Sequence, residues 1–306
     1  MAREFVSSFA RVYPQASYSV IPINRGQSLD LGFHLQRCYQ SARLLSGASV
    51  AASDDDWNRF LTECQRKVKL SEASLPSSGL LTLCSAARGP EWEVSCSYHH
   101  MDLEKLSHLS TAINPERGAV TVDLTRAMQR DHPSAKAARW TLERTPLESA
   151  RSPGAFETVL VSTEDEALEG LVSNLYVWRD SRLQTAPEGR VLRGSMSAIV
   201  ERLAAATGVP IEHSTPRLAE CHLWDAAFLT SATRPMLPVR LLLDSTGAPL
   251  VDFPNKLPDT LATLILMLRQ GLYECGGEKA KEEVLLQQMW CNHAESRSWD
   301  SFSIPI

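Results

Sequence analysis

The sequence contains no long apolar run and no low-complexity tract. Of its 306 residues, 43% are hydrophobic and 22% are charged, which is the composition of an ordinary globular protein. A membrane-spanning helix needs about 20 consecutive apolar residues, and no segment supplies them. Residues 1–20 lack the apolar core of a secretory signal, so export is not predicted. We expect a cytoplasmic protein, with organellar import left open.

Cysteine is sparse and scattered. The seven cysteines form no C-x-x-C pair, which favours a reducing compartment and argues against a zinc site. His99 and His100 are the only tight histidine pair, but adjacent strand residues point to opposite faces. No metal site is therefore predicted. The net charge of -5 gives no general attraction to nucleic acid or to anionic membranes, so we expect small-molecule partners and neither of those.

Several common catalytic motifs are also missing. The chain has no G-x-S-x-G elbow, no G-x-x-x-x-G-K-[ST] loop, no H-E-x-x-H helix and no G-x-G-x-x-G after a strand. The usual signs of a serine hydrolase, a P-loop nucleotide-binding enzyme, a zinc protease or a dinucleotide-binding fold are thus absent.

The first hundred residues read as an α+β unit. Residues 16–23 predict a strand, residues 29–45 a helix, and Ser53 with Asp56 the capped start of a second helix. Two strand-like runs around an Arg88-Gly89-Pro90 turn predict a hairpin, from 80–85 to 92–98.

A polar stretch at 110–118 is the best candidate linker. We therefore predict a small N-terminal domain over 1–112, a linker over 113–118 and a large domain over 119–306. The expected elements of the second part are strands at 156–162, 171–178 and 226–230, a helix through Met196 and Leu203 that ends at Gly208, a hairpin at 241–247, and helices at 261–273 and 279–290.

Three separated blocks carry a resemblance to one family. They are Glu169-Gly-Leu-Val-Ser-Asn174-Leu-Tyr176 continuing through Leu183-Gln-Thr185 and Leu192-Arg-Gly194, the upstream helix His34-Leu-Gln-Arg37-Cys-Tyr-Gln-Ser41-Ala42, and the downstream loop Ala227-Phe-Leu-Thr-Ser231-Ala232 with Pro238-Val239. Together they resemble the class IV (branched-chain and D-amino-acid type) aminotransferases, also called fold-type IV enzymes, which use pyridoxal 5'-phosphate (PLP). The resemblance spans residues 16–244.

The resemblance implies an α/β (α+β) fold of two domains. The small N-terminal domain is α+β, and the larger C-terminal PLP-binding domain has a strand-rich, barrel-like core. Residues 136–148 look more like a divergent eukaryotic branch of the class than like the branched-chain enzymes. Assembly as a homodimer is a further implication of the resemblance alone.

Lys136 is the residue that the resemblance assigns to the Schiff base. Its separation from Glu169 is close to the family's spacing, and no other lysine lies between Lys105 and Lys256. The apolar setting of Lys136 predicts a lowered pKa and hence a neutral, nucleophilic amine. Taken alone, a single lysine is more often a solvated surface charge.

Glu169 and Asn174 are both expected to lie in the cofactor site, with Glu169 at the pyridine nitrogen. PLP acts as an electron sink when its pyridine nitrogen is kept protonated, and Glu169 supplies the carboxylate for this. Asn174 is a supporting residue, as is Thr185, and both also read as side chains that satisfy nearby backbone groups.

The cofactor phosphate needs a fork donor and backbone amides. Arg37 is the expected fork donor, and the start of a helix at Ser195 and Met196 offers amides. The loop at Ser231 and Ala232 is expected to add further donors. The alternative for Arg37 is half of a surface ion pair on its helix.

The match departs from the family pattern at several positions. Leu171 stands where the family prefers a small residue, Ser195 where it prefers an aliphatic one, and Ser197 where it prefers Lys or Arg. Ala232 replaces a hydroxyl that many members direct to the phosphate. The strand at 18–22 lacks the arginine that often contacts the substrate carboxylate, so the amino donor and acceptor are not predicted.

The reaction implied by the resemblance is transfer of an amino group from an amino acid to a 2-oxo acid through the Lys136 Schiff base. Two alternatives stay open. One is an aminodeoxychorismate lyase-like enzyme, which uses the same lysine and cofactor to release pyruvate. The other is a non-catalytic paralogue that kept the fold.

Overall fold

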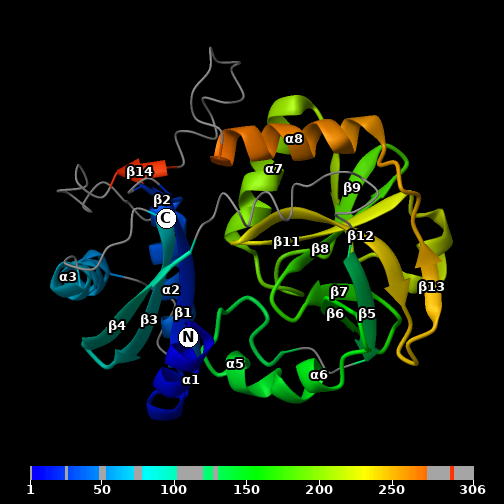
Figure 1. Ribbon diagram of the computed structural model, residues 1–306. Coiled ribbons are helices and arrows are strands. Elements are labelled where there is room, and N and C mark those ends of the chain that lie inside the picture. The colour runs from blue at the N-terminus through cyan, green and yellow to red at the C-terminus, as the bar shows by residue number, and fades with distance from the viewer. Residues whose placement is uncertain are drawn as a thin grey trace. The chain divides into compact units, whose positions relative to one another are not determined.

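The computed structural model describes residues 2–24, 27–47, 53–71, 78–101, 120–126, 130–273 and 290–292. The chain forms two compact units (Figure 1). Unit 1 takes residues from Met1–Leu103, Ala135–Glu143 and Gln288–Ile306, and unit 2 from Glu104–Ser134 and Arg144–Gln287. The predicted linker lies outside the described residues, so the predicted domain bounds stay a prediction. Residues 135–143 belong to unit 1 although they follow that linker.

Unit 1 is built on a five-stranded antiparallel sheet with the order β14-β2-β1-β3-β4. The strands are β1 Ser17–Asn24, β2 Gln27–Leu29, β3 Ser78–Arg88, β4 Glu91–His100 and β14 Trp290–Asn292. The β3–β4 hairpin and its turn, with Gly89 at φ 61°, confirm the predicted hairpin. A positive φ at this corner suits glycine because it has no Cβ.

Helices cover both faces of this sheet. They are α1 Ala2–Val12, α2 Leu31–Leu45, α3 Asp54–Ser71 and the short α5 Trp140–Glu143. Alternate residues of β1 point to opposite faces. Ile21 and Ile23 pack with α2 and α3, whereas Tyr18 packs with α1. The serines Ser17 and Ser19 share the α2 face with Ile21, which brings polar groups of β1 against that helix.

The α2–α3 side of unit 1 is fixed by a buried carboxylate. Asp56 accepts hydrogen bonds from Tyr39 Oη at 2.9 Å and Trp92 Nε1 at 3.0 Å, and it pairs with Arg43. Burial opposes ionisation of Asp56, but these donors outweigh it and lower its pKa. The Asp56 amide also donates to Ser53 Oγ at 3.2 Å, which confirms the predicted helix start.

Unit 2 is a closed barrel with extensions. The ring runs β8-β11-β12-β5-β6-β7, and it closes because β7 also pairs with β8. Its strands are β5 Val120–Arg126, β6 Glu157–Val161, β7 Ala167–Gly170, β8 Asn174–Arg179, β11 Ala226–Ser231 and β12 Arg234–Leu243. β9 Arg182–Thr185, β10 Ile211–His213 and β13 Pro249–Asp252 extend it. This architecture confirms the predicted α+β fold with a barrel-like core.

Inward-facing aliphatic side chains fill the barrel, among them Val122, Val159, Leu175, Val177 and Leu229. On the outside, α7 Ser195–Thr207 contacts β11, and α8 Asp259–Tyr273 contacts both α7 and β12 (Figure 1). The remaining helical segments are α6 Thr145–Ser149 and the 3-10 helix η2 Leu218–Leu223. Among the described residues, no helix has the length and apolarity to cross a bilayer.

Two sequence predictions differ from the structure in detail. The single strand predicted at 171–178 begins only at Asn174, because residues 171–173 form the turn between β7 and β8. Leu171 is buried in that turn, so the apolar pattern continues where the strand does not. Helix α1 was not predicted, and the predicted helix at 279–290 lies outside the described residues except for Trp290, which is in β14.

Candidate active site

In unit 1, α2 and β1 bring three polar side chains together. His34 and Arg37 are one turn apart on α2, and Ser19 reaches them from the facing side of β1. Ser19 Oγ lies 2.7 Å from His34 Nδ1, and Arg37 Nη2 donates to Ser19 Oγ at 2.7 Å. Ser19 is completely buried, so this contact is part of the interior of the unit.

Arg37 is a buried cation. Only 9% of the residue is exposed, and its Nε has no hydrogen-bond partner in the structure. Burial lowers the pKa of Arg37 to about 10, which leaves it charged at neutral pH. No carboxylate in the described part of the chain forms an ion pair with it, so the surface ion-pair alternative is wrong for these residues. An anion could compensate a buried guanidinium in this state.

His34 adds no charge to this site at neutral pH. Burial is the largest influence on its pKa, followed by the positive charges of Arg37 and Lys136, and together they lower it well below the usual value. The imidazole is therefore neutral, and its Nε2 is buried without a hydrogen-bond partner. The permanent positive charge of the cluster comes from Arg37.

Lys136 is held in unit 1 by its backbone. Its amide donates to Ser41 Oγ at 3.0 Å, and its carbonyl accepts from the Tyr18 amide at 3.0 Å. Ser41 lies one turn beyond Arg37 on α2, so the same helix positions both Arg37 and Lys136. The Lys136 side chain is half-buried, with Nζ 4.8 Å from the centroid of the Tyr18 ring. This setting differs from that of a solvated surface lysine.

In unit 2, Glu169 lies near the end of β7 in a buried ion pair with Arg130. Glu169 Oε1 accepts from Arg130 Nη2 at 2.6 Å and from Nε at 3.0 Å. The two side chains are 9% and 8% exposed. Oε2 accepts from the Leu192 amide at 3.2 Å. These donors all favour the ionised carboxylate.

Asn174, on β8, contacts the loop that contains Leu192. Its Nδ2 donates to the Leu192 carbonyl at 2.6 Å. A Cβ at Gly194 would stand only 2.4 Å from Asn174 Oδ1, so this close approach requires glycine. Glu169 and Asn174 are paired residues of β7 and β8, and together they fix residues 192–194, from which α7 starts.

The start of α7 offers backbone donors at Ser195 and Met196. Gly194 is the extended N-cap, and no side chain caps this helix. The first-turn amides of a helix suit a phosphate because they point outward at the positive end of the helix dipole. Both predicted residues are buried at this helix start.

Ser231 and Ala232 lie where β11 turns into β12. Thr230 of β11 pairs with Asn174 of β8, so this turn begins beside the row that contains Glu169 and Asn174. Thr230 Oγ1 is buried without a hydrogen-bond partner. Thr185 Oγ1 donates to the Leu175 carbonyl at 2.7 Å, which is the structural role that the sequence left open for it.

The structure thus gathers the predicted residues in two groups, each within one unit. Arg37 and Lys136 belong to unit 1, and Glu169, Asn174, Ser195, Met196, Ser231 and Ala232 belong to unit 2. The sequence did not point to Arg130 or Ser19. Neither residue falls in a recognisable motif, and each acquires its role only through a partner far away in the chain.

The contact between Gly194 and Asn174 makes a stability prediction. Gly194→Ala is expected to lower the free energy of unfolding by about 1–3 kcal/mol through overpacking. In an Asn174→Ala background the new methyl has room, and the same change is expected to cost less than about 1 kcal/mol, a non-additive result. Urea titrations of the four proteins measure this. Equal costs in both backgrounds would contradict the contact.

Comparison with known proteins places this fold in a family. Residues 17–242 match the family model described as amino-transferase class IV. The match covers most of the chain, and the protein belongs to this family. This confirms the predicted resemblance and supports pyridoxal 5'-phosphate as the cofactor. Comparison with curated protein sequences gives no match.

Solved structures show the same fold. A hypothetical aminotransferase from Mycobacterium tuberculosis in its PLP-bound form is 22% identical with a TM-score of 0.63, covering 84% of this chain and 89% of that one. A 4-amino-4-deoxychorismate lyase from Pseudomonas aeruginosa is 20% identical with a TM-score of 0.64, covering 85% and 92%. The branched-chain amino acid aminotransferase from Escherichia coli is 15% identical with a TM-score of 0.63, covering 87% and 86%.

Proposed function

We propose that this protein is a PLP-dependent aminotransferase that moves an amino group from an amino acid to a 2-oxo acid. The observation that carries the proposal is the pair of basic side chains in unit 1, Lys136 and Arg37. Lys136 is a half-buried primary amine, and Arg37 is a buried guanidinium whose Nε has no partner. PLP requires an amine to react with its aldehyde and a cation to bind its phosphate.

Unit 2 supports the proposal through Glu169. PLP supplies an electron sink when its pyridine nitrogen is protonated, and a buried carboxylate keeps it so. The contacts of Arg130 and of the Leu192 amide orient Glu169. We assign Glu169 to the pyridine nitrogen, with Arg130 as its positioning residue.

The amides of Ser195 and Met196 at the start of α7 are the proposed backbone donors to the phosphate, together with Arg37. Asn174 acts indirectly, because it fixes the loop before this helix. The turn at Ser231 and Ala232 is proposed to provide the remaining hydrogen-bond donors to the phosphate. Ala232 offers only a backbone amide, which leaves this phosphate site with one hydroxyl fewer than many relatives.

Lys136 is the proposed catalytic residue. With an amino acid bound, Lys136 Nζ would accept the proton from the substrate α-carbon and later return it. Cytoplasmic location, homodimer formation and amino-acid and 2-oxo-acid substrates belong to the proposal as expectations of the resemblance.

A pyruvate-releasing lyase is the second candidate, because one of the similar structures is an aminodeoxychorismate lyase. Incubation with PLP and a panel of amino acids separates the two functions. The aminotransferase converts a 2-oxo acid to the matching amino acid and stops when the oxo acid is omitted. Pyruvate release from aminodeoxychorismate without any acceptor would establish the lyase. Neither product at any donor would indicate the non-catalytic paralogue.

A further inference from the structure

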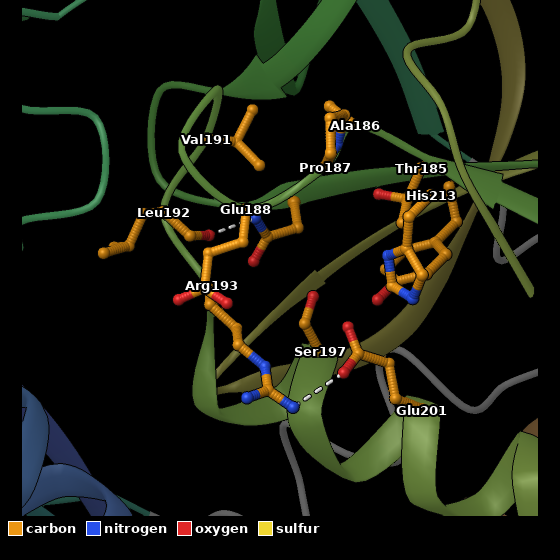
Figure 2. Close-up of a pocket in the computed structure, with 12 residues that line it drawn as sticks. Thr185, Ala186, Pro187, Glu188, Val191, Leu192, Arg193, Ser197, Glu201 and His213 are labelled. Carbon is orange, nitrogen blue, oxygen red and sulfur yellow. Dashed lines mark hydrogen bonds and ion pairs between the residues drawn. The ribbon is translucent and has the colours of Figure 1, made fainter.

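Unit 2 contains an open cavity of about 480 Å³ against the outer side of the barrel. It is lined by α7, by the loop from Thr185 to Arg193, and by His213 of β10 (Figure 2). Of the residues assigned to the cofactor, only Asn174 borders it, while Glu169, Ser195, Met196 and Ser231 do not. Its size is in the range of small-molecule sites.

One wall of the cavity is rich in hydrogen-bond acceptors. Ser197 and Glu201 lie one turn apart on α7, and Figure 2 shows both on the side of the helix that borders the cavity. Tyr176 borders the same cavity, close enough for both side chains to influence the pKa of its hydroxyl. Burial, followed by the nearby Glu201 charge, raises the pKa of Tyr176, so the phenol stays protonated. Three oxygen-bearing side chains therefore border this part of the cavity.

The charge around the cavity is negative on balance. Glu188 and Glu201 are its two carboxylates, and Arg193 is its one guanidinium. Arg193 already pairs with Glu201 at 2.9 Å, and its side chain is 48% exposed compared with 20% for Glu201. A ligand therefore meets the carboxylate and hydroxyl oxygens deeper in the cavity than the guanidinium.

The remaining lining is apolar. Ala186, Pro187, Val191 and Leu192 form the loop side of the cavity, and Ala186, Val191 and Leu192 are buried. Tyr176 itself is held rigid, because its ring stacks on Phe228 at 5.0 Å between centroids and 2° between planes. An acceptor-rich wall facing an apolar wall suits a ligand with a cationic head and a small hydrocarbon body.

The sequence explains why this space exists. Ser197 occupies the position at which the resembled signature prefers Lys or Arg. A serine there removes the volume of a long side chain and its positive charge, while Glu201 remains one turn away. Residue 197 therefore contributes no positive charge, and the cavity has room for a cationic group.

We infer that this cavity is a separate binding site for a small organic ammonium compound, with the cationic nitrogen at Ser197, Tyr176 and Glu201 and the hydrocarbon part against Pro187, Val191 and Leu192. The inference is independent of the proposed reaction, because it uses neither Lys136 nor Glu169. Occupancy of the site does not require the cofactor.

The probe is N,N-dimethylphenethylammonium, a tertiary amine that cannot form an imine with PLP. Its binding to the full-length protein is followed by saturation-transfer NMR and compared with 2-phenylethanol and 3-phenylpropionate. We expect saturable binding of the ammonium compound and at least tenfold weaker binding of the alcohol and the carboxylate. Tighter binding of the carboxylate, or no saturable binding of the ammonium compound, would overturn the inference.

Two variants locate the site. Ser197→Arg fills the cavity with a cation, and Glu201→Gln removes the carboxylate at almost constant volume; each is expected to weaken binding at least tenfold. Ala206→Arg adds the same charge at an exposed position of α7 and is expected to bind like the wild type. Undiminished binding by a folded Ser197→Arg or Glu201→Gln protein would refute the assignment. Failure of transamination has no bearing on either outcome.

Discussion

Lys136→Ala is expected to abolish amino transfer, with kcat reduced about 10⁴-fold or more, because one side chain is both the covalent anchor and the proton carrier. The fold is expected to survive. The contacts that hold this segment to Ser41 and Tyr18 are made by backbone atoms of Lys136, and alanine keeps them. Steady-state rates with the best donor of the panel, together with a thermal melt, test both parts.

Two further variants make this result specific. Lys136→Arg keeps a cation beside the Tyr18 ring but removes the primary amine, and it is expected to be as inactive as the alanine variant. Lys256→Ala removes a lysine whose side chain is 83% exposed, and it is expected to leave the rate unchanged. More than a tenth of the wild-type rate in folded Lys136→Ala would show that another group performs the chemistry.

Arg37→Met is expected to have opposite effects on the empty protein and on cofactor binding. Without an anion, the buried guanidinium is poorly compensated, and a methionine of similar length is expected to raise the free energy of unfolding by about 1–3 kcal/mol. With PLP, the loss of a charge-assisted contact of about 1.5–3 kcal/mol is expected to weaken binding by about one to two orders of magnitude. The free energy of unfolding of the empty protein should therefore rise, while the affinity for PLP falls.

Arg43→Met on the same helix is the matched control. Arg43 pairs with Asp56, and its removal leaves a largely buried carboxylate with fewer donors. This variant is expected to lose stability and to keep its affinity for PLP. Urea titrations with and without PLP measure both quantities, because a ligand that binds only the folded protein raises the apparent stability by RT ln(1 + c/Kd), where c is the concentration of free PLP. Destabilisation of the empty protein by Arg37→Met, with PLP affinity intact, would show that Arg37 is only a structural residue.

Much of the candidate site could be predicted from local sequence. Glu169 and Arg37 each lie in a short sequence block, and Lys136 was assigned from its spacing to Glu169. The structure places all three at least half-buried. The helix beginning at Ser195 was visible in the apolar spacing that follows it and in Gly208, which ends it at φ 73°. These features depend on residues that are close in the chain.

The partners of these residues could not be predicted in the same way. Arg130 is 39 residues away from Glu169, and Ser41 is 95 residues away from Lys136. Such contacts arise only when the sheet and barrel are formed, and no periodicity encodes them. The turn at 171–173 was missed for a related reason. Burial of Leu171 gives that turn the hydrophobic signal of a strand.

The cavity beside α7 shows what a departure from a motif can mean. From the sequence alone, Ser197 could be interpreted only as a departure from the family pattern. The structure places this serine beside Tyr176 and Glu201 in the lining of an open cavity. The serine in place of Lys or Arg therefore predicts that the cavity prefers a cationic ligand.

The central claim is that Lys136 is the lysine that holds PLP. It is tested most directly by adding one equivalent of PLP to the purified protein, reducing with borohydride, and digesting for mass spectrometry. We expect a single pyridoxyl phosphate group on the peptide that contains Lys136, near one equivalent per chain. A label spread over other lysines, or no stable label at all, would contradict the claim.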